Sequence, residues 1–341
     1  MSEAPLAAGI DGGATRTRAV LVRSDGTIAG FGSAGPSNYD NVGEAAAAAN
    51  LHTAFAAARK AAGPGAGPVT AMFLGMAGVV SRADRETVRR MVGTLAPPDA
   101  VEVDHDIRIA LAGGLECAEG IVLIAGTGSS TYGRRADGRS HRTGWGFLLD
   151  DRGSGYWLGL QAMIATVMEA DGRGSHTALG DPVRARFKFT EIDDILHVLY
   201  HDRIPVAEVA SLAPDVIRIA REGDSVAQEI LANGAREIAR MVSVVARRLA
   251  FGAGVPVTMT GGLVDRRGDY RAMIDAEILK SLPGASIVPP SFPPVIGAAL
   301  LALEGAGVRR TEKMIAHLKD QVRLLPPGAG GPEATTAEAS S

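Results

Sequence analysis

The chain has 341 residues, of which 46% are hydrophobic and 21% are charged, so it can bury the cores of two ordinary domains. The formal net charge of −3 shows no basic excess, which excludes nucleic acid as an expected partner. The sequence predicts no membrane span and no signal peptide, and Cys117 has no second cysteine with which to form a disulfide or a metal cluster. We therefore expect a cytoplasmic protein.

The first part of the chain predicts short strands joined by tight turns. Residues 7–22 predict a strand, a glycine turn and a second strand, and Asp25-Gly26 predicts a hairpin into a third. Ser81 is a plausible cap for one of the helices that follow. Further helices and strands of this part are expected at 43–62, 69–74, 81–95 and 101–103.

The same order of strand, glycine turn, strand and Asp-Gly hairpin begins again at residue 120. The repeat is one of architecture, without long sequence identity, and it predicts two related βββαβα halves. Asp224 is a plausible cap for one of the later helices. The remaining elements are expected at 155–170, 191–201, 206–222, 225–251, 255–260, 295–305 and 310–323.

The expected domain organisation follows from this duplication. We predict a first subdomain over residues 1–115 and a second over 116–308. Residues 309–324 predict an amphipathic helix that can pack back on the first subdomain. Residues 325–341 are rich in proline, glycine, serine and threonine, a composition typical of a disordered tail.

The first candidate site is the turn between the two strands of residues 7–22. Glycines let backbone amides approach phosphate oxygens, and hydroxyl side chains add donors. A carboxylate at the end of the first strand, Asp11, can hold Mg²⁺ through water. The alternative is a plain glycine hairpin, and the turn matches neither GxxxxGK[ST] nor GxGxxG. The candidate phosphate-binding residues are Gly12, Gly13, Ala14, Thr15 and Thr17.

A second turn of the same kind follows the apolar strand that begins at residue 120. If the two halves of the chain are related, the two turns face each other across a cleft and can hold one triphosphate between them. This pairing favours phosphate binding over two unrelated structural turns. The residues of the second turn are Gly126, Thr127, Gly128 and Ser129.

Two carboxylates, Asp104 and Asp106, follow the strand at 101–103. A carboxylate at a strand end can accept the proton of a hydroxyl that attacks a phosphoryl group. The alternative for either residue is a helix cap or a solvated loop. The spacing alone leaves open which of the two is the base.

Two further segments predict contacts to organic ligands. Gly144, Trp145 and Asp151 combine glycines, an aromatic ring and a carboxylate, which suits a sugar, although a structural loop with core aromatics is the alternative. Gly261-Gly262 follows a strand and can let an adenine or ribose lie against the backbone, although it can also be a simple tight turn.

The order of these segments resembles the N-acetylglucosamine kinase family, within the broader BadF/BadG/BcrA/BcrD ATPase-like group. The resemblance covers about residues 7–305. It implies an α/β protein of the actin-like ATPase (ribonuclease H-like) fold, with two domains that close on ATP-Mg²⁺ and an amino sugar. The matching segments are GIDGGATRTRAVLV, GPSNYDNVG, VDHDIRIALAGG, IVLIAGTGSS, GWGFLLDDRGSGYWLG, TGGLV and PPVIGAALLA.

The resemblance also assigns roles to residues. It implies that Asp106 is the catalytic base, with Asp104 as the second choice, and that Gly261, Gly262 and Gly297 lie on the nucleotide side. Members of the family are often dimers, so the resemblance also implies a homodimer. The sugar-side positions that it implies are Asn38, Asp106, Thr127, Gly128, Gly144, Trp145 and Asp151.

The expected activity is transfer of the γ-phosphate of ATP to the 6-hydroxyl of N-acetylglucosamine, glucosamine or N-acetylmuramic acid. Arg152 stands where the family often has an acidic residue, which leaves the particular sugar open. A non-catalytic sensor of ATP and sugar is one alternative, although a sensor has no need of Asp11 and Asp106. An ATPase activator of a dehydratase or reductase is another, but one cysteine supplies too few thiolates for its iron–sulfur cluster.

Overall fold

A computed structural model describes residues 5–200, 204–265 and 268–325 of the chain. Close contacts divide these residues into two units. Unit 1 contains residues 5–119 and 289–325, and unit 2 contains the described residues between 120 and 288. Apart from Leu325, the segment predicted to be a disordered tail lies outside the described residues.

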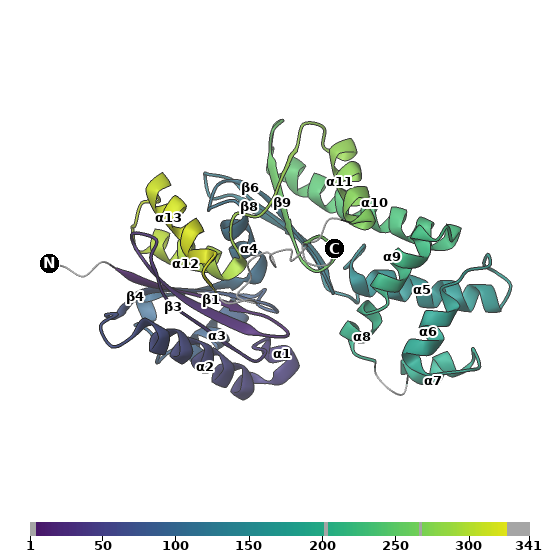
Figure 1. The fold of residues 1–341 in the computed structure, drawn as a ribbon, viewed down its shortest axis with the longest axis horizontal. Coiled ribbons are helices and arrows are strands. Elements are labelled where there is room, and N and C mark those ends of the chain that lie inside the picture. The colour runs from purple at the N-terminus through teal and green to yellow at the C-terminus, as the bar shows by residue number, and fades with distance from the viewer. Residues whose placement is uncertain (1–4, 201–203, 266–267, 326–341) are drawn as a thin grey trace, which may run out of the picture. The chain divides into compact units, whose positions relative to one another are not determined.

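Unit 1 is built on a five-stranded sheet in the order β3-β2-β1-β4-β5. Figure 1 labels three of these strands, β1, β3 and β4. The first three strands pair antiparallel through two short turns, and β4 and β5 continue the sheet parallel to β1. Parallel strands covered on both faces need apolar side chains at most positions, which explains the near-continuous apolar runs of β1 and β4. The strands are β1 (Leu6–Gly12), β2 (Thr17–Arg23), β3 (Ile28–Ala34), β4 (Val69–Met76) and β5 (Val101–His105).

Helices cover both faces of this sheet, because successive side chains of a strand point to opposite sides. Leu6, Ala8 and Ile10 pack with α2 (Glu44–Ala62) and α3 (Arg82–Val92). Ala7 packs on the other side, with the helices α4, α12 and α13. The remaining helical segments of unit 1 are α1 (Tyr39–Val42), η1 (Pro98–Ala100), α4 (Asp106–Gly114), α12 (Pro294–Gly305) and α13 (Glu312–Val322).

The helix α12 belongs to unit 1, whereas the sequence places residues up to 308 in the second subdomain. The physical reason is close packing of small residues. A Cβ on Gly9 of β1 would lie 2.3 Å from the backbone nitrogen of Ala299, so only glycine lets α12 approach the strand this closely. Figure 1 shows α12 and α13, both yellow, beside the purple strands of unit 1, where the sequence also predicts that the last helix packs.

Unit 2 repeats the sheet of unit 1. Its order is β10-β9-β6-β7-β8, with β6 in the place of β1, antiparallel to β7 and parallel to β9. The strands β7 and β8 are antiparallel, and β9 and β10 are parallel. The predicted duplication is therefore confirmed. The strands are β6 (Gly120–Ala125), β7 (Ser129–Arg134), β8 (Ser140–Thr143), β9 (Pro256–Thr260) and β10 (Ser286–Val288).

The helices of unit 2 enclose one apolar core that includes Ile121 and Leu123 of β6. Asp224 and, in unit 1, Ser81 cap helices as predicted. The expected helix at 206–222 is two helices, because Pro214 fits only the first turn of a new helix. The helices are α5 (Gly155–Ala170), α6 (Gly180–Phe187), α7 (Asp194–Tyr200), α8 (Val206–Ala210), α9 (Ala213–Arg221), α10 (Ser225–Arg248) and α11 (Asp269–Ser281).

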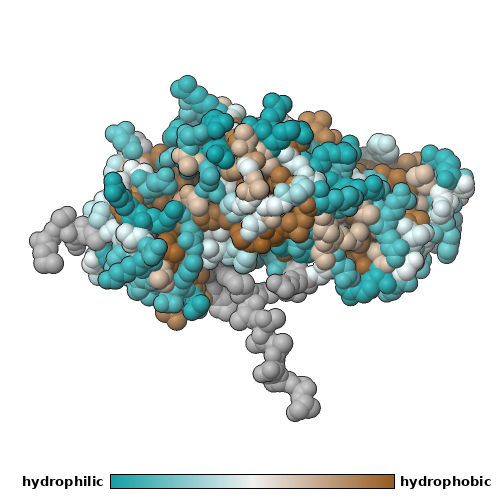
Figure 2. Space-filling view, turned by 90° about the horizontal axis from the view of Figure 1, so that it is seen from above, coloured by the Kyte–Doolittle hydropathy of each residue, from teal (hydrophilic) through white to brown (hydrophobic). Residues whose placement is uncertain are grey.

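The surface is mixed in character. Figure 2 shows hydrophilic residues interspersed with apolar ones on the face in view. The large apolar side chains most exposed to solvent include Leu148 and Leu149, in the loop that follows Trp145. None of the helices in the described part of the chain combines the length and apolar character that crossing a membrane requires.

Candidate functional site

The turn between β1 and β2 is fixed through its carbonyl groups. The Gly13 carbonyl oxygen accepts hydrogen bonds from the amides of Ser37, at 3.1 Å, and Asn38, at 3.3 Å. The amides of Ala14 and Thr15 have no partner among the described residues, and both residues are exposed. Rigid carbonyls and unpartnered amides make this turn suitable for binding an anion, as predicted for phosphate.

Thr17 lies at the base of this turn and is fully buried. Its Oγ1 lies 2.7 Å from the carbonyl oxygen of Gly35 and 2.8 Å from Oγ of Ser37. The described contacts of the hydroxyl are therefore with the segment that follows β3, and they hold the turn in place. The predicted contact of Thr17 with phosphate stays a prediction.

Asp11 lies at the end of β1, next to the turn. One carboxylate oxygen is 3.1 Å from Nη1 of Arg18, and the side chain is 14% exposed. Burial raises the pKa of Asp11, and the guanidinium groups of Arg18 and Arg16 partly offset the effect. Among the described residues, no group of three or more histidine, cysteine or carboxylate side chains is placed to hold a metal ion. Asp11 stays a predicted ligand of Mg²⁺ through water.

Asn38 is joined to the first turn by its backbone and caps α1 with its side chain. Its Oδ1 accepts a hydrogen bond from the amide of Asp40 at 3.1 Å. This contact uses the acceptor of the side chain and leaves its NH₂ group as a donor. The structure therefore brings Asn38, a predicted sugar contact, next to the predicted phosphate turn of the same unit.

The turn between β6 and β7 is attached to the beginning of α5. The carbonyl oxygens of Gly126 and Thr127 accept hydrogen bonds from the amides of Gly155, at 2.8 Å, and Tyr156, at 3.0 Å. The amides of Thr127 and Gly128 have no partner within the described part of the chain. The second turn therefore repeats the first in its chemistry, with fixed carbonyls and two available donors.

Asp151 lies directly beside the second turn. Its Oδ1 accepts a hydrogen bond from the amide of Ser129 at 3.3 Å, and a Cβ on Gly128 would lie 2.7 Å from its Oδ2. The φ of Asp151 is +52°, a left-handed conformation that costs a non-glycine residue energy and occurs often at functional sites. Burial raises the pKa of Asp151; the Ser129 hydrogen bond opposes this effect, and the charge of Asp150 adds to it. The structure thus brings together a phosphate-type turn and a carboxylate that can bind a sugar hydroxyl.

The aromatic residue predicted to contact the sugar is accessible. Trp145 is 67% exposed, and the Arg142 guanidinium carbon lies 5.5 Å from the centroid of the Trp145 ring. Gly144, which precedes it, has a φ of +97°, and a Cβ there would lie 2.6 Å from Cβ of Ser130. Glycine is therefore required where the chain passes the second turn, and this close approach holds the tryptophan near it.

Asp104 and Asp106 differ in their surroundings. Asp104 is buried and forms ion pairs with Arg85, at 2.7 Å, and Arg108, at 2.8 Å. Burial alone would raise its pKa, but the charge of His105 and the hydrogen bonds from Arg108 and Arg85 outweigh it and lower the pKa to about 2. A carboxylate held this strongly in its ionised form is a poor proton acceptor, whereas Asp106 is partly exposed at the first position of α4.

The predicted nucleotide-side glycines of unit 2 lie against the end of β6. Gly261 has a φ of +118°, and a Cβ there would lie 2.4 Å from the carbonyl oxygen of Ala125. A Cβ on Gly126 would lie 3.6 Å from the amide nitrogen of Gly262. The structure therefore brings this glycine pair next to the second turn.

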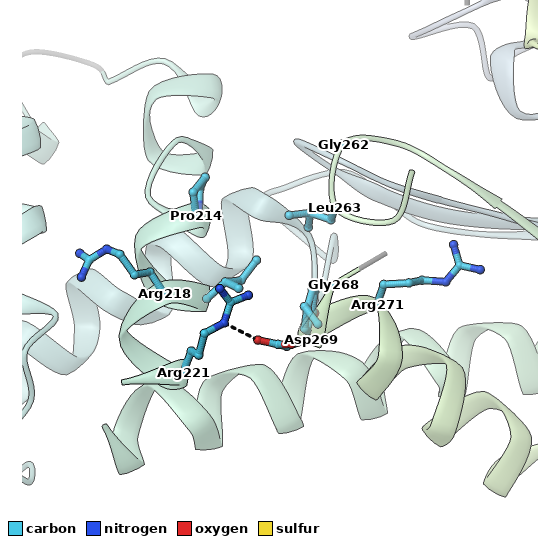
Figure 3. Close-up of a pocket in the computed structure, with 10 residues that line it drawn as sticks. Pro214, Arg218, Arg221, Gly262, Leu263, Gly268, Asp269 and Arg271 are labelled. Carbon is cyan, nitrogen blue, oxygen red and sulfur yellow. Dashed lines mark hydrogen bonds and ion pairs between the residues drawn. The ribbon is translucent and has the colours of Figure 1, made fainter. Parts of the chain in front are cut away.

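A pocket of about 300 Å³ opens beside Gly262 (Figure 3). Most of the surface that lines it is apolar, and Arg221 and Asp269 form an ion pair at 2.7 Å within the lining. The size suits a planar heterocycle. The lining residues are Pro214, Ile217, Arg218, Arg221, Gly262, Leu263, Gly268, Asp269, Tyr270 and Arg271.

Gly297 is buried in the contact between α12 and α4. A Cβ there would lie 2.0 Å from the carbonyl oxygen of Ile109 and 2.4 Å from the amide nitrogen of Gly113. Helix packing alone therefore accounts for this glycine, and its predicted contact with nucleotide stays a prediction.

The groups that fix the carboxylates in place were not predicted from the sequence. Arg108 stands four residues after Asp104, and this spacing in the sequence is typical of an ion pair. Arg85 has no such signal, because it comes from a separate helix. Tyr270, whose hydroxyl reaches the loop of Asp151, also gave none.

Two sheets of the same strand order, each with a glycine turn between its first two strands, define a duplicated actin-like ATPase fold. The chain belongs to the BadF/BadG/BcrA/BcrD ATPase family, whose sequence model matches residues 8–302. This finding confirms the fold and the family that the sequence resemblance implies.

Curated relatives and solved structures agree with this assignment. The chain is 32% identical to the N-acetylmuramic acid/N-acetylglucosamine kinase of Clostridium acetobutylicum, over 75% of this chain and 85% of the relative. It is 30% identical to the N-acetyl-D-glucosamine kinase of Dictyostelium discoideum, over 86% of this chain and 97% of the relative. A crystal structure from Chromobacterium violaceum, classed as an N-acetylglucosamine kinase, superposes with a TM-score of 0.67 at 28% identity, covering 88% of this chain and 99% of that one.

Proposed function

We propose that the protein is an ATP-dependent kinase that phosphorylates an amino sugar of the N-acetylglucosamine class. The observation that carries this proposal is the arrangement around Gly128. Two unpartnered amides of a phosphate-type turn lie beside the buried carboxylate of Asp151, so groups suited to phosphate and to a sugar hydroxyl are adjacent. The names of the curated relatives, which are kinases of amino sugars, support the same activity and the same substrate class.

The proposed roles follow the chemistry of phosphoryl transfer, which depends on positioning and on neutralising charge. The amides of each glycine turn serve as donors to phosphate groups of ATP, and the pocket beside Gly262 takes its adenine. Asp151 and Asn38 hydrogen-bond sugar hydroxyls, and Trp145 packs against the sugar ring. Asp11 holds Mg²⁺ through water, and this ion, when bound, neutralises charge on the phosphates.

Asp106 is the proposed proton acceptor for the attacking 6-hydroxyl of the sugar. Its neighbour Asp104 is ionised and already paired with two guanidinium groups, which supports the assignment of this role to Asp106. The cytoplasmic location and the homodimer that the sequence implies stay predictions.

The test is a measurement of ADP release with ATP, Mg²⁺ and a panel of hexoses that contains N-acetylglucosamine, glucosamine, N-acetylmuramic acid and glucose. We expect release that depends on the amino sugar, with the phosphate on the 6-hydroxyl of the isolated product. Binding of ATP and sugar without turnover would contradict the kinase and favour a sensor. ATP hydrolysis that no sugar stimulates would also contradict it.

A further inference from the structure

The loop that carries Asp151 is held through three successive carbonyl groups. The Asp151 carbonyl oxygen accepts a hydrogen bond from the Ser154 amide at 3.0 Å. The Arg152 carbonyl oxygen accepts one from the Ser129 hydroxyl at 3.0 Å. The Gly153 carbonyl oxygen accepts one from the Tyr270 hydroxyl at 2.8 Å. The first bond closes the turn itself, whereas the other two come from β7 and α11, so the shape of this acceptor loop (residues 151–153) depends on contacts from elsewhere in unit 2.

Tyr270 is the contact that comes from the farthest point in the chain. It is the second residue of α11, is 1% exposed, and is one of the residues that line the pocket beside Gly262. Burial raises the pKa of Tyr270, so its hydroxyl is protonated at neutral pH and donates its hydrogen bond to the Gly153 carbonyl oxygen. One residue therefore touches both the candidate nucleotide pocket and the acceptor loop.

The hydroxyl of Tyr270 is closely packed against the backbone of α10. A Cβ on Gly234 of α10 would lie 2.5 Å from the Tyr270 Oη, and a Cβ on Gly153 would lie 2.5 Å from the Gly234 carbonyl oxygen. The φ of Gly153 is +76°. Two glycines thus let the loop, the helix α10 and the phenol pack in direct contact, so that the position of Tyr270 and that of the loop depend on each other.

We propose that Tyr270 is a positioning residue that links occupation of the pocket beside Gly262 to the geometry of the sugar-binding loop at Asp151. A heterocycle in the pocket fixes the beginning of α11, and the hydroxyl of Tyr270 then holds Gly153 and, two residues earlier, the carboxylate of Asp151. Nucleotide and sugar therefore strengthen each other's binding through this bond. The inference rests on the proposed function, because it takes the pocket as the adenine site.

The test compares wild type with Tyr270→Phe, which keeps the ring and removes the hydroxyl. Calorimetry gives the Kd of N-acetylglucosamine with and without a non-hydrolysable ATP analogue. In wild type we expect tighter sugar binding with the analogue, and in Tyr270→Phe we expect this enhancement to fall by about 3- to 10-fold, the effect of one lost hydrogen bond. Because the coupling is reciprocal, the effect of N-acetylglucosamine on the Kd of the ATP analogue should fall by the same factor.

The matched control is Tyr200→Phe, which removes a hydroxyl that is exposed at the end of α7 and should leave the enhancement unchanged. An unchanged enhancement in Tyr270→Phe, or none in wild type, would overturn the inference. A wild-type protein that binds neither ATP nor amino sugar would instead refute the proposed function.

A second measurement does not depend on a variant. Hydrogen exchange of wild type should show slower exchange at the amides of residues 152–154 when the ATP analogue alone is added. Exchange at these amides that does not respond to the analogue would also overturn the inference.

Discussion

At the scale of single residues, Asp106 and Asp104 stand two positions apart and are expected to have different roles, Asp106 in catalysis and Asp104 in stability. Asp106→Asn keeps the size of the side chain and removes its ability to accept a proton. We expect turnover to fall by about 10²- to 10⁴-fold, the usual contribution of a general base, while ATP binding is largely retained. Steady-state kinetics and nucleotide titration check this, and near-normal turnover would remove Asp106 from the role.

Asp104→Asn should mainly affect stability, because it removes the buried negative charge with which Arg85 and Arg108 form ion pairs. The pKa of Asp104 is lowered from 3.8 to about 2, so its ionised form stabilises the fold above about pH 4, and the benefit disappears as the pH falls towards 2. We expect Asp104→Asn to cost about 2 kcal/mol at pH 7 and much less near pH 2.5. Urea unfolding at both values measures this; an equal cost at the two values would contradict it.

Arg152 is exposed in the acceptor loop and has no ion pair within the described residues. Its positive charge should favour acceptors that carry a carboxylate. We expect Arg152→Glu to lower the ratio of kcat/KM for N-acetylmuramic acid to that for N-acetylglucosamine by about 3- to 10-fold. Arg173→Glu, in the exposed turn after α5, is the control, and a ratio that stays constant in Arg152→Glu would show that this charge does not select the acceptor.

At the scale of elements, the contact between α12 and α4 depends on Gly297. Gly297→Ala would place a methyl group on the backbone of α4, and we expect it to destabilise the protein by about 1–3 kcal/mol through overpacking. Gly305→Ala, in the same helix with open space around it, is the matched control and should be neutral or slightly stabilising. Thermal unfolding distinguishes the two, and equal stability of both variants would argue against a close helix contact.

The elements that the sequence predicts correctly are those with local signals. The strand and glycine turn at each repeat, the cap at Ser81 and the cap at Asp224 are all readable within a few residues. The helix α4 was not predicted, because Asp104 and Asp106 were interpreted as carboxylates at the end of the preceding strand.

The contacts that shape the candidate site are harder to predict. Tyr270 and Gly153 are 117 residues apart in the chain, so no local sequence pattern predicts the hydrogen bond between them. The burial of Thr17 and the pairing of Arg85 with Asp104 likewise depend on which segments pack together. The sequence therefore predicts which segments form the site, and the packing of each unit determines which side chains remain available.

At the scale of the whole molecule, the last helix stabilises the first unit. Met314, Ile315 and Leu318 of α13 are buried against unit 1, and Lys319 forms an ion pair with Glu116 at 2.6 Å. We expect truncation after residue 308 to lower stability by at least about 2 kcal/mol, since it exposes this apolar face. Truncation after Leu325 is the control, and equal melting temperatures of the two proteins would contradict the prediction.

The division of unit 1 between the two ends of the chain has a consequence for biosynthesis. Unit 2 is continuous over 120–288, so all of its strands are translated before α12 and α13 and emerge from the ribosome ahead of them. The N-terminal strands emerge first, yet one face of their sheet is covered only by α4 until the final helices arrive. We expect the inserted half to fold first, while the nascent N-terminal half presents an apolar sheet face to chaperones until translation ends.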